Sequence, residues 1–333
     1  MNINQMKSAI AKFRKADLSV IKDAKLRNKA QSLQGKEKGF TLLELLVVIT
    51  LIAILATGAL IAYEDVGQSA EAASAGNAAA TIDRAIRTYR AVENVYPNQW
   101  DNLVDSAGSQ LTFRAPIMDS FLAAWTPGVS GDSGKGDAMI EMLEESGIEE
   151  LQVVNAGGTP NGDQAPNRFH NESTGDSAEV EIEDGDLPAR FAVVPNDNCQ
   201  AGGAATALVD YPANAFDTTV TVSGNNLQNQ YGDALEGDEC HVLIALGFGG
   251  DAAASTTFSN VAIAQSPTYV RNTGDEDTEV NPETHYSRYI GLFQAGEFNF
   301  DVNEMQWNET IRLIAIVSPD GKNIDQLVSE AQQ

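Results

Sequence analysis

Residue types that carry much of enzyme and metal chemistry are scarce in this chain. It has two cysteines and three histidines among 333 residues. It contains no Cys-x-x-Cys pair, no His-Glu-x-x-His motif, no Gly-x-Ser-x-Gly elbow and no phosphate-binding glycine loop. These absences argue against a zinc or redox centre and against common classes of hydrolase. We therefore predict that the protein is not an enzyme and holds no cofactor of the organic kind.

One glycine pattern would contradict the prediction of no cofactor if it bound a nucleotide. Gly247, Gly249 and Ala252 fit G-x-G-x-x-A directly after a run that is typical of a strand. The residues at 255–260 do not begin a convincing helix, and a lone glycine fingerprint is weak evidence. We therefore do not interpret this segment as a nucleotide site.

Basic residues are few after residue 39. Residues 1–39 carry 10 Lys or Arg against 3 Asp or Glu, a balance of +7, whereas residues 40–333 carry 11 against 44, a balance of −33. The positive-inside rule places the first part in the cytoplasm and the acidic part across a membrane. The excess of carboxylates would repel phosphate, so no nucleic-acid partner is expected.

An apolar run at 38–62 contains one carboxylate, Glu44. The 18 residues at 45–62 are uncharged and rise about 27 Å as a helix, which approaches the roughly 30 Å of a hydrocarbon core. An ionised carboxylate inside that core costs about 2.5–3.5 kcal/mol on insertion scales. Glu44 is therefore expected to lie at the boundary or to have a partner.

The stretch GFTLLE at 39–44 resembles the processing site of type IV pilins and of the pseudopilins of type II secretion systems. The resemblance implies that a prepilin peptidase cuts between Gly39 and Phe40 and that the new amino group of Phe40 is methylated. It also implies a partner for Glu44, the amino terminus of a neighbouring subunit in the filament. Opposite charges that meet in a low dielectric remove much of each other's insertion cost, so Glu44 would fix the register of assembly.

Two other kinds of segment were weighed. An ordinary signal peptide has its small-residue cleavage site after the apolar run, whereas Gly39 precedes it. A plain membrane anchor explains the apolar run and the preceding lysines. It gives no reason for a glutamate five residues after the glycine.

The leader at 1–39 has Ile3, Met6, Ile10 and Phe13 at helical spacing among basic residues. One interpretation is an amphipathic helix on the anionic inner leaflet. The other is a solvated basic tail that enforces orientation. The sequence leaves both open.

After the apolar run the alanine-rich stretch to 92 contains no proline. We predict one helix over 40–92, about 75 Å long, with its transmembrane part at about 42–62. Ile82, Ile86 and Tyr89 would be buried against a globular head. A row of Arg84, Arg87 and Arg90 is interpreted as a solvated face that pairs with carboxylates of the head within the chain, with a subunit contact as the alternative.

The head at 93–333 follows a Tyr96-Pro97 turn that ends the helix, a feature also similar to pilins. Trp100 and Leu103 are expected to pack beneath it. Short aliphatic or β-branched runs predict a β-rich domain, which could divide into two subdomains. The fold class is α+β and pilin-like, a long helix on a β-rich head. The expected strands are 189–195, 218–224, 241–247, 260–266 and 310–317.

Cys199 and Cys240 fall in the part placed outside the cytoplasm. An even count in an oxidising compartment favours one disulfide between them. His241, beside Cys240, is interpreted as a strand residue, although a metal corner is not excluded by its position.

Calcium is the better metal candidate, since oxygen-rich loops supply the ligands it takes and pseudopilin heads of the resembled family sometimes hold it. Acidic loops that are simply solvated are the alternative. The candidate ligands are Asp132, Asp137, Asp184, Asp186, Asp275 and Asp277.

The sequence therefore predicts a structural subunit of a type IV pilus or type II secretion pseudopilus. It would be a single-pass precursor in the inner membrane and then part of a periplasmic or extracellular filament. Its partners would be other pilin subunits, the peptidase and the inner-membrane assembly machinery. A minor or tip pilin with an adhesive head is the alternative and a surface-displayed enzyme a distant one. The large tip pseudopilin of secretion systems typically lacks this glutamate, so Glu44 argues against that role.

Overall fold

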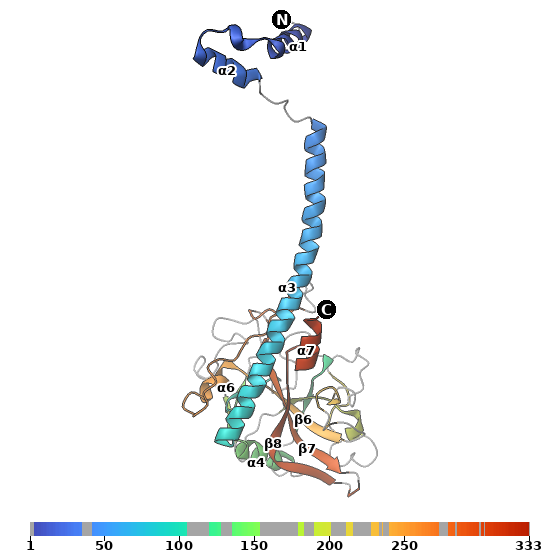
Figure 1. Ribbon diagram of the computed structural model, residues 1–333. Coiled ribbons are helices and arrows are strands. Elements are labelled where there is room, and N and C mark those ends of the chain that lie inside the picture. The colour runs from blue at the N-terminus through green and yellow to red at the C-terminus, as the bar shows by residue number, and fades with distance from the viewer. Residues whose placement is uncertain are drawn as a thin grey trace. The chain divides into compact units, whose positions relative to one another are not determined.

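The computed structural model places the described residues in two compact units, Met1–Tyr63 and Glu64–Gln333 (Figure 1). The described residues are 3–34, 42–104, 120–127, 135–153, 179–182, 190–200, 211–215, 228–232, 235, 240–272, 279–283, 285–299, 301–302 and 304–332.

The first unit is helical in its described part. Helices α1 (Ile3–Lys15) and α2 (Ala24–Gln34) flank a 3-10 turn, η1 (Leu18–Val20). Helix α3 (Leu42–Glu93) begins in this unit and ends in the second. Its 52 residues confirm the predicted long helix. Gly58, Gly67 and Gly76 lie within it and do not interrupt it.

The second unit contains an eight-stranded mixed sheet with strand order β2-β5-β6-β1-β3-β4, to which β7 adds beside β6 and β8 beside β7. The pairs are antiparallel except β1 with β3. The strands are β1 (Trp100–Asn102), β2 (Ala123–Trp125), β3 (Glu150–Val153), β4 (Glu179–Glu181), β5 (Phe191–Val193), β6 (Cys240–Gly247), β7 (Ile290–Asn299) and β8 (Glu304–Val317). The shorter helices are α4 (Lys135–Glu145), η3 (Asp197–Gln200), α6 (Gly250–Ser255) and α7 (Ile324–Glu330).

Strand β6 is the centre of this sheet. All eight of its residues are buried, as expected for an uninterrupted aliphatic run with both faces covered. One edge pairs with β7 along its whole length, and the other edge is shared by β5 and β1. Strand β8 lies beyond β7 and is largely half-exposed.

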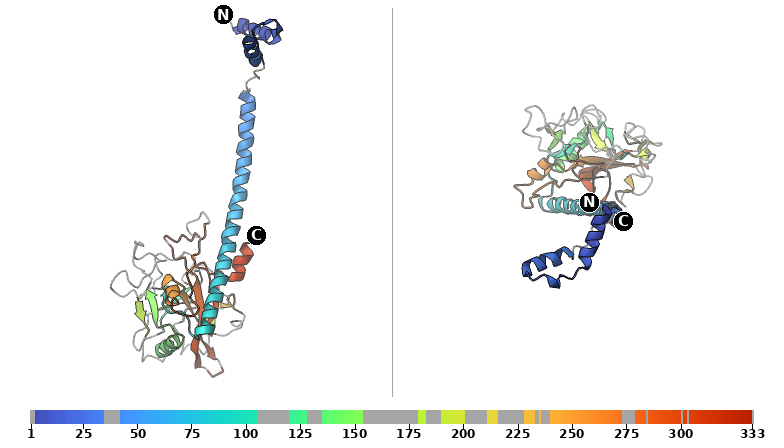
Figure 2. Two further views of the ribbon diagram at one scale, coloured as in Figure 1. Left: turned by 60° about the vertical axis from the view of Figure 1, so that its left-hand side comes forward. Right: turned by 90° about the horizontal axis from the view of Figure 1, so that it is seen from above.

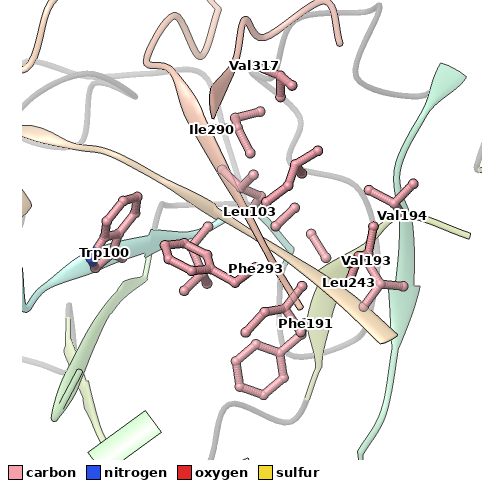
Figure 3. Packing of buried hydrophobic residues seen from close by; sticks show 14 of the residues in the cluster. Trp100, Leu103, Phe191, Val193, Val194, Leu243, Ile290, Phe293 and Val317 are labelled. Atoms are coloured by element: carbon pink, nitrogen blue, oxygen red, sulfur yellow. The ribbon is translucent and has the colours of Figure 1, made fainter. Parts of the chain in front are cut away.

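Aromatic side chains fill the core beside β6 and β7. Trp100 is fully buried and meets Phe248 and Phe293 edge to face, with each pair of ring centroids 5.1 Å apart (Figure 3). Its indole Nε1 donates to the carbonyl of Pro97 at 2.6 Å. Leu103 is also buried, so the predicted packing of Trp100 and Leu103 is confirmed. Edge-to-face geometry suits the charge distribution of aromatic rings and adds to the stabilisation from burial alone.

The part of α3 in this unit lies across one face of the sheet (Figures 1 and 2). Ile82 and Ile86 are buried there, and Tyr89 is nearly so, which confirms the predicted face. The hydroxyl of Tyr289 donates to the carbonyl of Ala75 at 2.9 Å. A side chain at Gly76 would meet Val328 Cγ2 of α7 at 3.3 Å, so helix α7 lies close against this turn of α3.

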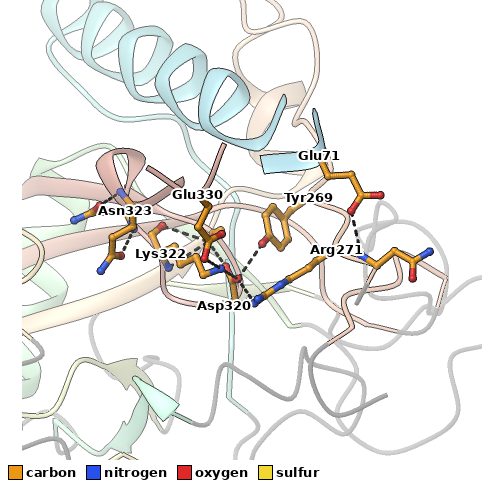
Figure 4. Close-up of polar contacts among 10 residues, drawn as sticks. Glu71, Tyr269, Arg271, Asp320, Lys322, Asn323 and Glu330 are labelled. Carbon is orange, nitrogen blue, oxygen red and sulfur yellow. Dashed lines mark hydrogen bonds and ion pairs between the residues drawn. The ribbon is translucent and has the colours of Figure 1, made fainter. Parts of the chain in front are cut away.

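The chain between β8 and α7 makes the turn that its Ser-Pro-Asp-Gly-Lys sequence predicts. Gly321 adopts a positive φ of 77°, and the amide of Ser318 donates to the carbonyl of Lys322 at 3.0 Å. Asp320 is buried at its centre. Its carboxylate accepts hydrogen bonds from Tyr269 at 2.9 Å and from Arg271 at 2.8 Å (Figure 4). Lys322 Nζ lies 3.3 Å from the same carboxylate.

This cluster connects three segments that are distant in sequence. A buried carboxylate needs paired charge and hydrogen bonds, and Asp320 has both. Lys322 also pairs with Glu330 of α7, and the amide of Asn272 donates to Glu71 of α3 at 3.3 Å (Figure 4). The contacts therefore hold α7 and the Tyr269–Arg271 segment beside the same stretch of α3.

Three of the predicted strands are confirmed and one is wrong. β5, β6 and β8 fall in or over the expected runs. Residues 260–266 form no strand, because the amides of Val261 and Ile263 bond to the hydroxyls of Ser259 and Thr256 in the preceding turn and not to a neighbouring strand. The run at 218–224 lies outside the described residues.

The predicted disulfide joins η3 to the first residue of the central strand. Cys199 and Cys240 are bonded, with their Cα atoms 4.7 Å apart and a sequence separation of 41. His241 follows Cys240 within β6 and is 2% exposed. The interpretation of His241 as a strand residue is therefore confirmed.

Replacing both Cys199 and Cys240 by serine should lower the free energy of unfolding by about 3–4 kcal/mol, because the loop between them is then no longer closed in the unfolded chain. Denaturant unfolding of wild type and double variant measures the difference. Mass mapping of the unreduced digest is the control for the bond itself. Two free thiols in protein taken from the periplasm would contradict the assignment.

Candidate assembly helix

The first part of α3 has an apolar surface that no described residue covers. Leu42–Leu60 has a mean hydropathy of 2.5 and none of it is buried. Its 19 residues rise about 28 Å, close to the thickness of a bilayer core. By length and composition this helix is long and apolar enough to cross a membrane. Its hydroxyls bond within the helix, Thr50 to the carbonyl of Val47 and Thr57 to that of Ala53, both at 2.9 Å.

Glu44 lies in the first turn of this helix with its side chain exposed. A carboxylate at a helix N-terminus is favoured by the unpaired amides and by the helix dipole. That position lowers the cost of its charge but leaves it at the start of an apolar surface. Gly39 and Phe40, the predicted processing site, lie outside the described residues.

The end of α3 is fastened to the head by the Tyr-Pro turn. Asn94 adopts a positive φ of 62° and its carbonyl accepts from Arg90 Nη1 at 2.5 Å. Tyr96 accepts from the amide of Leu313 at 3.0 Å through its hydroxyl, and its own amide donates to the carbonyl of Ser146 at 2.7 Å. The turn therefore reaches both β8 and the end of α4, so the direction of the helix and the position of the head are set together.

The three arginines of α3 have different surroundings. Arg87 pairs with Asp83 at 2.9 Å and donates to the carbonyl of Ile314 at 3.2 Å. Arg90 donates to Thr310 and lies over the ring of Tyr96, 4.8 Å from its centroid. Arg84 is exposed. Arg87 thus pairs inside the chain, but with a carboxylate of its own helix, so the predicted pairing with head carboxylates is wrong for Arg87.

The glycine pattern after β6 surrounds a buried carboxylate. Asp101 of β1 is 2% exposed, and Tyr286 donates to its Oδ2 at 2.7 Å. A side chain at Gly249 would meet Asp101 Oδ1 at 2.4 Å, and one at Gly247 would meet the hydroxyl of Tyr286 at 1.8 Å. The space that the glycines leave is thus filled by the chain itself, which agrees with interpreting the pattern as something other than a nucleotide site.

Burial raises the pKa of Asp101 to about 7, against the lowering effect of the hydrogen bond from Tyr286. The nearby Asp251 raises it further and Arg288 lowers it. Burial also raises the pKa of Tyr286 well above its usual value, so its hydroxyl stays a donor. Sequence patterns missed this pair, because neither residue belongs to a recognisable motif.

Only one of the six calcium candidates lies in the described part of the chain. Asp137 is exposed in the first turn of α4. Among the described residues there is no group of three or more His, Cys, Asp or Glu that could hold a metal. Asp132, Asp184, Asp186, Asp275 and Asp277 lie outside the described residues.

Comparison with known proteins supports the identity of the N-terminal segment. A family model described as a prokaryotic N-terminal methylation motif matches residues 34–60. Fimbrial protein EcpC of Eikenella corrodens is 37% identical over 99 residues, which are 29% of this chain and 62% of that protein. The chain thus spans less than two thirds of the length of that relative. No solved structure matches the chain.

The helix therefore has one apolar half that no described residue covers and one half that packs on the head. The methylation motif and the similarity to a fimbrial protein support a relationship to type IV pilin-family proteins.

Asp101→Asn should flatten the dependence of stability on pH between about 4 and 7. With a folded-state pKa of about 7, the folded protein holds the proton in a window where the unfolded chain has lost it. Stability therefore falls as pH rises, by at most about 1.4 kcal/mol per pH unit. The amide cannot ionise yet still accepts from Tyr286. Denaturant unfolding across this range gives the two slopes.

Asp137→Asn, at an exposed position, is the matched control and should keep the wild-type slope. Equal slopes for wild type and Asp101→Asn would contradict the role of this carboxyl.

Proposed function

We propose that this chain is a structural subunit of a type IV pilus, inserted in the inner membrane as a precursor and polymerised through α3. The observation that carries the proposal is the uncovered apolar surface of Leu42–Leu60, 0% buried, in a helix that continues into the head. In a bilayer that surface meets acyl chains. In a filament the same surface would meet the corresponding helices of other subunits.

Processing would separate the basic leader from this helix. We infer cleavage between Gly39 and Phe40, with methylation of the new amino group. Cleavage places a positive charge four residues before Glu44, at the end of the span. Paired across two subunits, the carboxylate and the amino group would offset each other's insertion costs, whereas either alone remains expensive.

Several related functions share these features. A subunit of a type II secretion pseudopilus would use the same helix and motif, and imaging of purified surface filaments distinguishes it from a pilus. A minor or tip pilin with an adhesive head would be scarce, whereas a major subunit is abundant. The peptidase and the inner-membrane assembly machinery are proposed partners. Calcium binding by the acidic loops stays a prediction.

Gly39→Val should leave full-length precursor in the inner membrane, because the peptidase must accommodate this side chain and glycine has none. N-terminal sequencing of membrane fractions measures it. Gly58→Val is the control, since it adds the same bulk where nothing lies within 4 Å of a Cβ, and it should be cut normally. A mature chain starting at Phe40 in Gly39→Val would refute the proposed site.

Glu44→Val should insert and be cleaved but should reduce filament yield by on the order of tenfold or more. The change removes an insertion cost of about 2.5–3.5 kcal/mol while deleting the partner of an amino terminus, and breaking a buried pair costs about 3–5 kcal/mol. Sheared filaments are quantified against the membrane pool.

Glu44→Gln separates charge from size and should behave like Glu44→Val. Thr50→Val removes a polar group that bonds within the helix and should assemble normally. Normal filament yield from cleaved Glu44→Val subunits would refute the pairing, even for a genuine pilin.

A further inference from the structure

The leader forms two short helices that carry one sign of charge. Neither α1 nor α2 contains an acidic residue. Their described basic side chains include Lys7, Lys12 and Lys15 in α1, and Lys25 and Lys29 in α2, all exposed. Such a surface attracts anionic partners.

Helix α1 also has an apolar face without cover in the described part of the chain. Met6, Ile10 and Phe13 are 48%, 53% and 39% exposed. Their spacing of four and then three places them within about 60° of one another around the helix. Lys12 and Lys15 point away from that face, and Lys7 flanks it. This is the arrangement of a helix that lies in the boundary of a membrane.

The two helices are joined into a hairpin. Leu18 of η1 is buried, and Asp17 caps η1 by accepting from the amide of Ser19 at 2.9 Å. The side chain of Gln34, at the end of α2, donates to the carbonyl of Phe13 at 2.7 Å and to that of Ala16 at 2.9 Å. These contacts connect the last turn of α1 to the last turn of α2.

We propose that the α1–α2 hairpin docks on an anionic lipid surface, with Met6, Ile10 and Phe13 in the acyl boundary and the lysines among the headgroups. The assignment of this surface to the cytoplasmic leaflet rests on the proposed function. Continuity with the span supports lipid as the occupant. Eight residue steps separate Gln34 from Leu42, so the hairpin stays within about 28 Å of the start of the span. A weak interfacial helix becomes well occupied when it is tethered to its membrane.

The charge of the hairpin selects the kind of lipid. Lysines near a surface are attracted by anionic headgroups over about one Debye length, and zwitterionic headgroups give no such attraction. Docking is therefore expected to need both anionic lipid and the apolar face. A protein partner would not need anionic lipid.

The test uses the full-length precursor reconstituted in vesicles. Cys199 and Cys240 are bonded to each other, so one added cysteine supplies a single thiol for a polarity-sensitive fluorophore. Ala9→Cys lies beside the apolar face and Ser8→Cys lies nearly opposite. With anionic lipid, the label at Ala9→Cys should shift to the blue and be quenched by quencher-bearing lipid. The label at Ser8→Cys should show neither change.

Zwitterionic vesicles, or the added change Phe13→Asp, should abolish most of the quenching at Ala9→Cys. Ser32→Asp is the charge-matched control on α2 and should keep it. Equal quenching at the two positions, or quenching that does not depend on anionic lipid, would overturn the proposal. Carbonate extraction of the same samples reports insertion of the span, so a failure of the hairpin to dock is distinguished from a failure of the proposed membrane anchor.

Discussion

The structure depends on one constraint: an apolar helical surface about as long as a bilayer is thick cannot remain in water. Leu42–Leu60 must always be covered, first by lipid and, in the proposed filament, by other subunits. Because both environments are apolar, moving between them changes the hydrophobic energy little. In the proposed filament, the selection of partner and register would then come from the carboxylate in this surface, Glu44. A single carboxylate could decide the assembly because the apolar side chains around it do not favour one partner or register over another.

The second part of α3 connects that apolar surface to the acidic head. Ile82 and Ile86 supply apolar burial, and backbone carbonyls of the helix and sheet accept from Tyr289 and Arg87. The Asp320 cluster holds α7 against the same stretch. Apolar contact alone would permit the helix to slide, whereas directional hydrogen bonds fix one position along its axis.

Much of this architecture is predictable because it depends on long, strongly periodic or uniform segments. The 52-residue helix, its buried face, the central strand β6 and the disulfide are confirmed. The strand prediction for residues 260–266 was wrong because strand propensity cannot indicate whether a neighbouring strand is present. The Asp101–Tyr286 pair could not be predicted from the sequence, because the two residues are 185 positions apart and only the fold brings them together. The proposed cleavage and pairing remain predictions, since they depend on a second molecule.

The contacts between α3 and the head run along the helix from Glu71 to the turn at Tyr96. A fibre under tension would pull on each subunit along this axis, so the buried side chains and hydrogen bonds would be loaded together in shear and not peeled apart one after another. The Tyr96 turn is hydrogen-bonded to β8 and to the end of α4. These bonds would have to break before the helix could slide out of the head. The mechanical strength of the contact between α3 and the head would therefore depend on the direction of the load as well as on the binding energy of the contact.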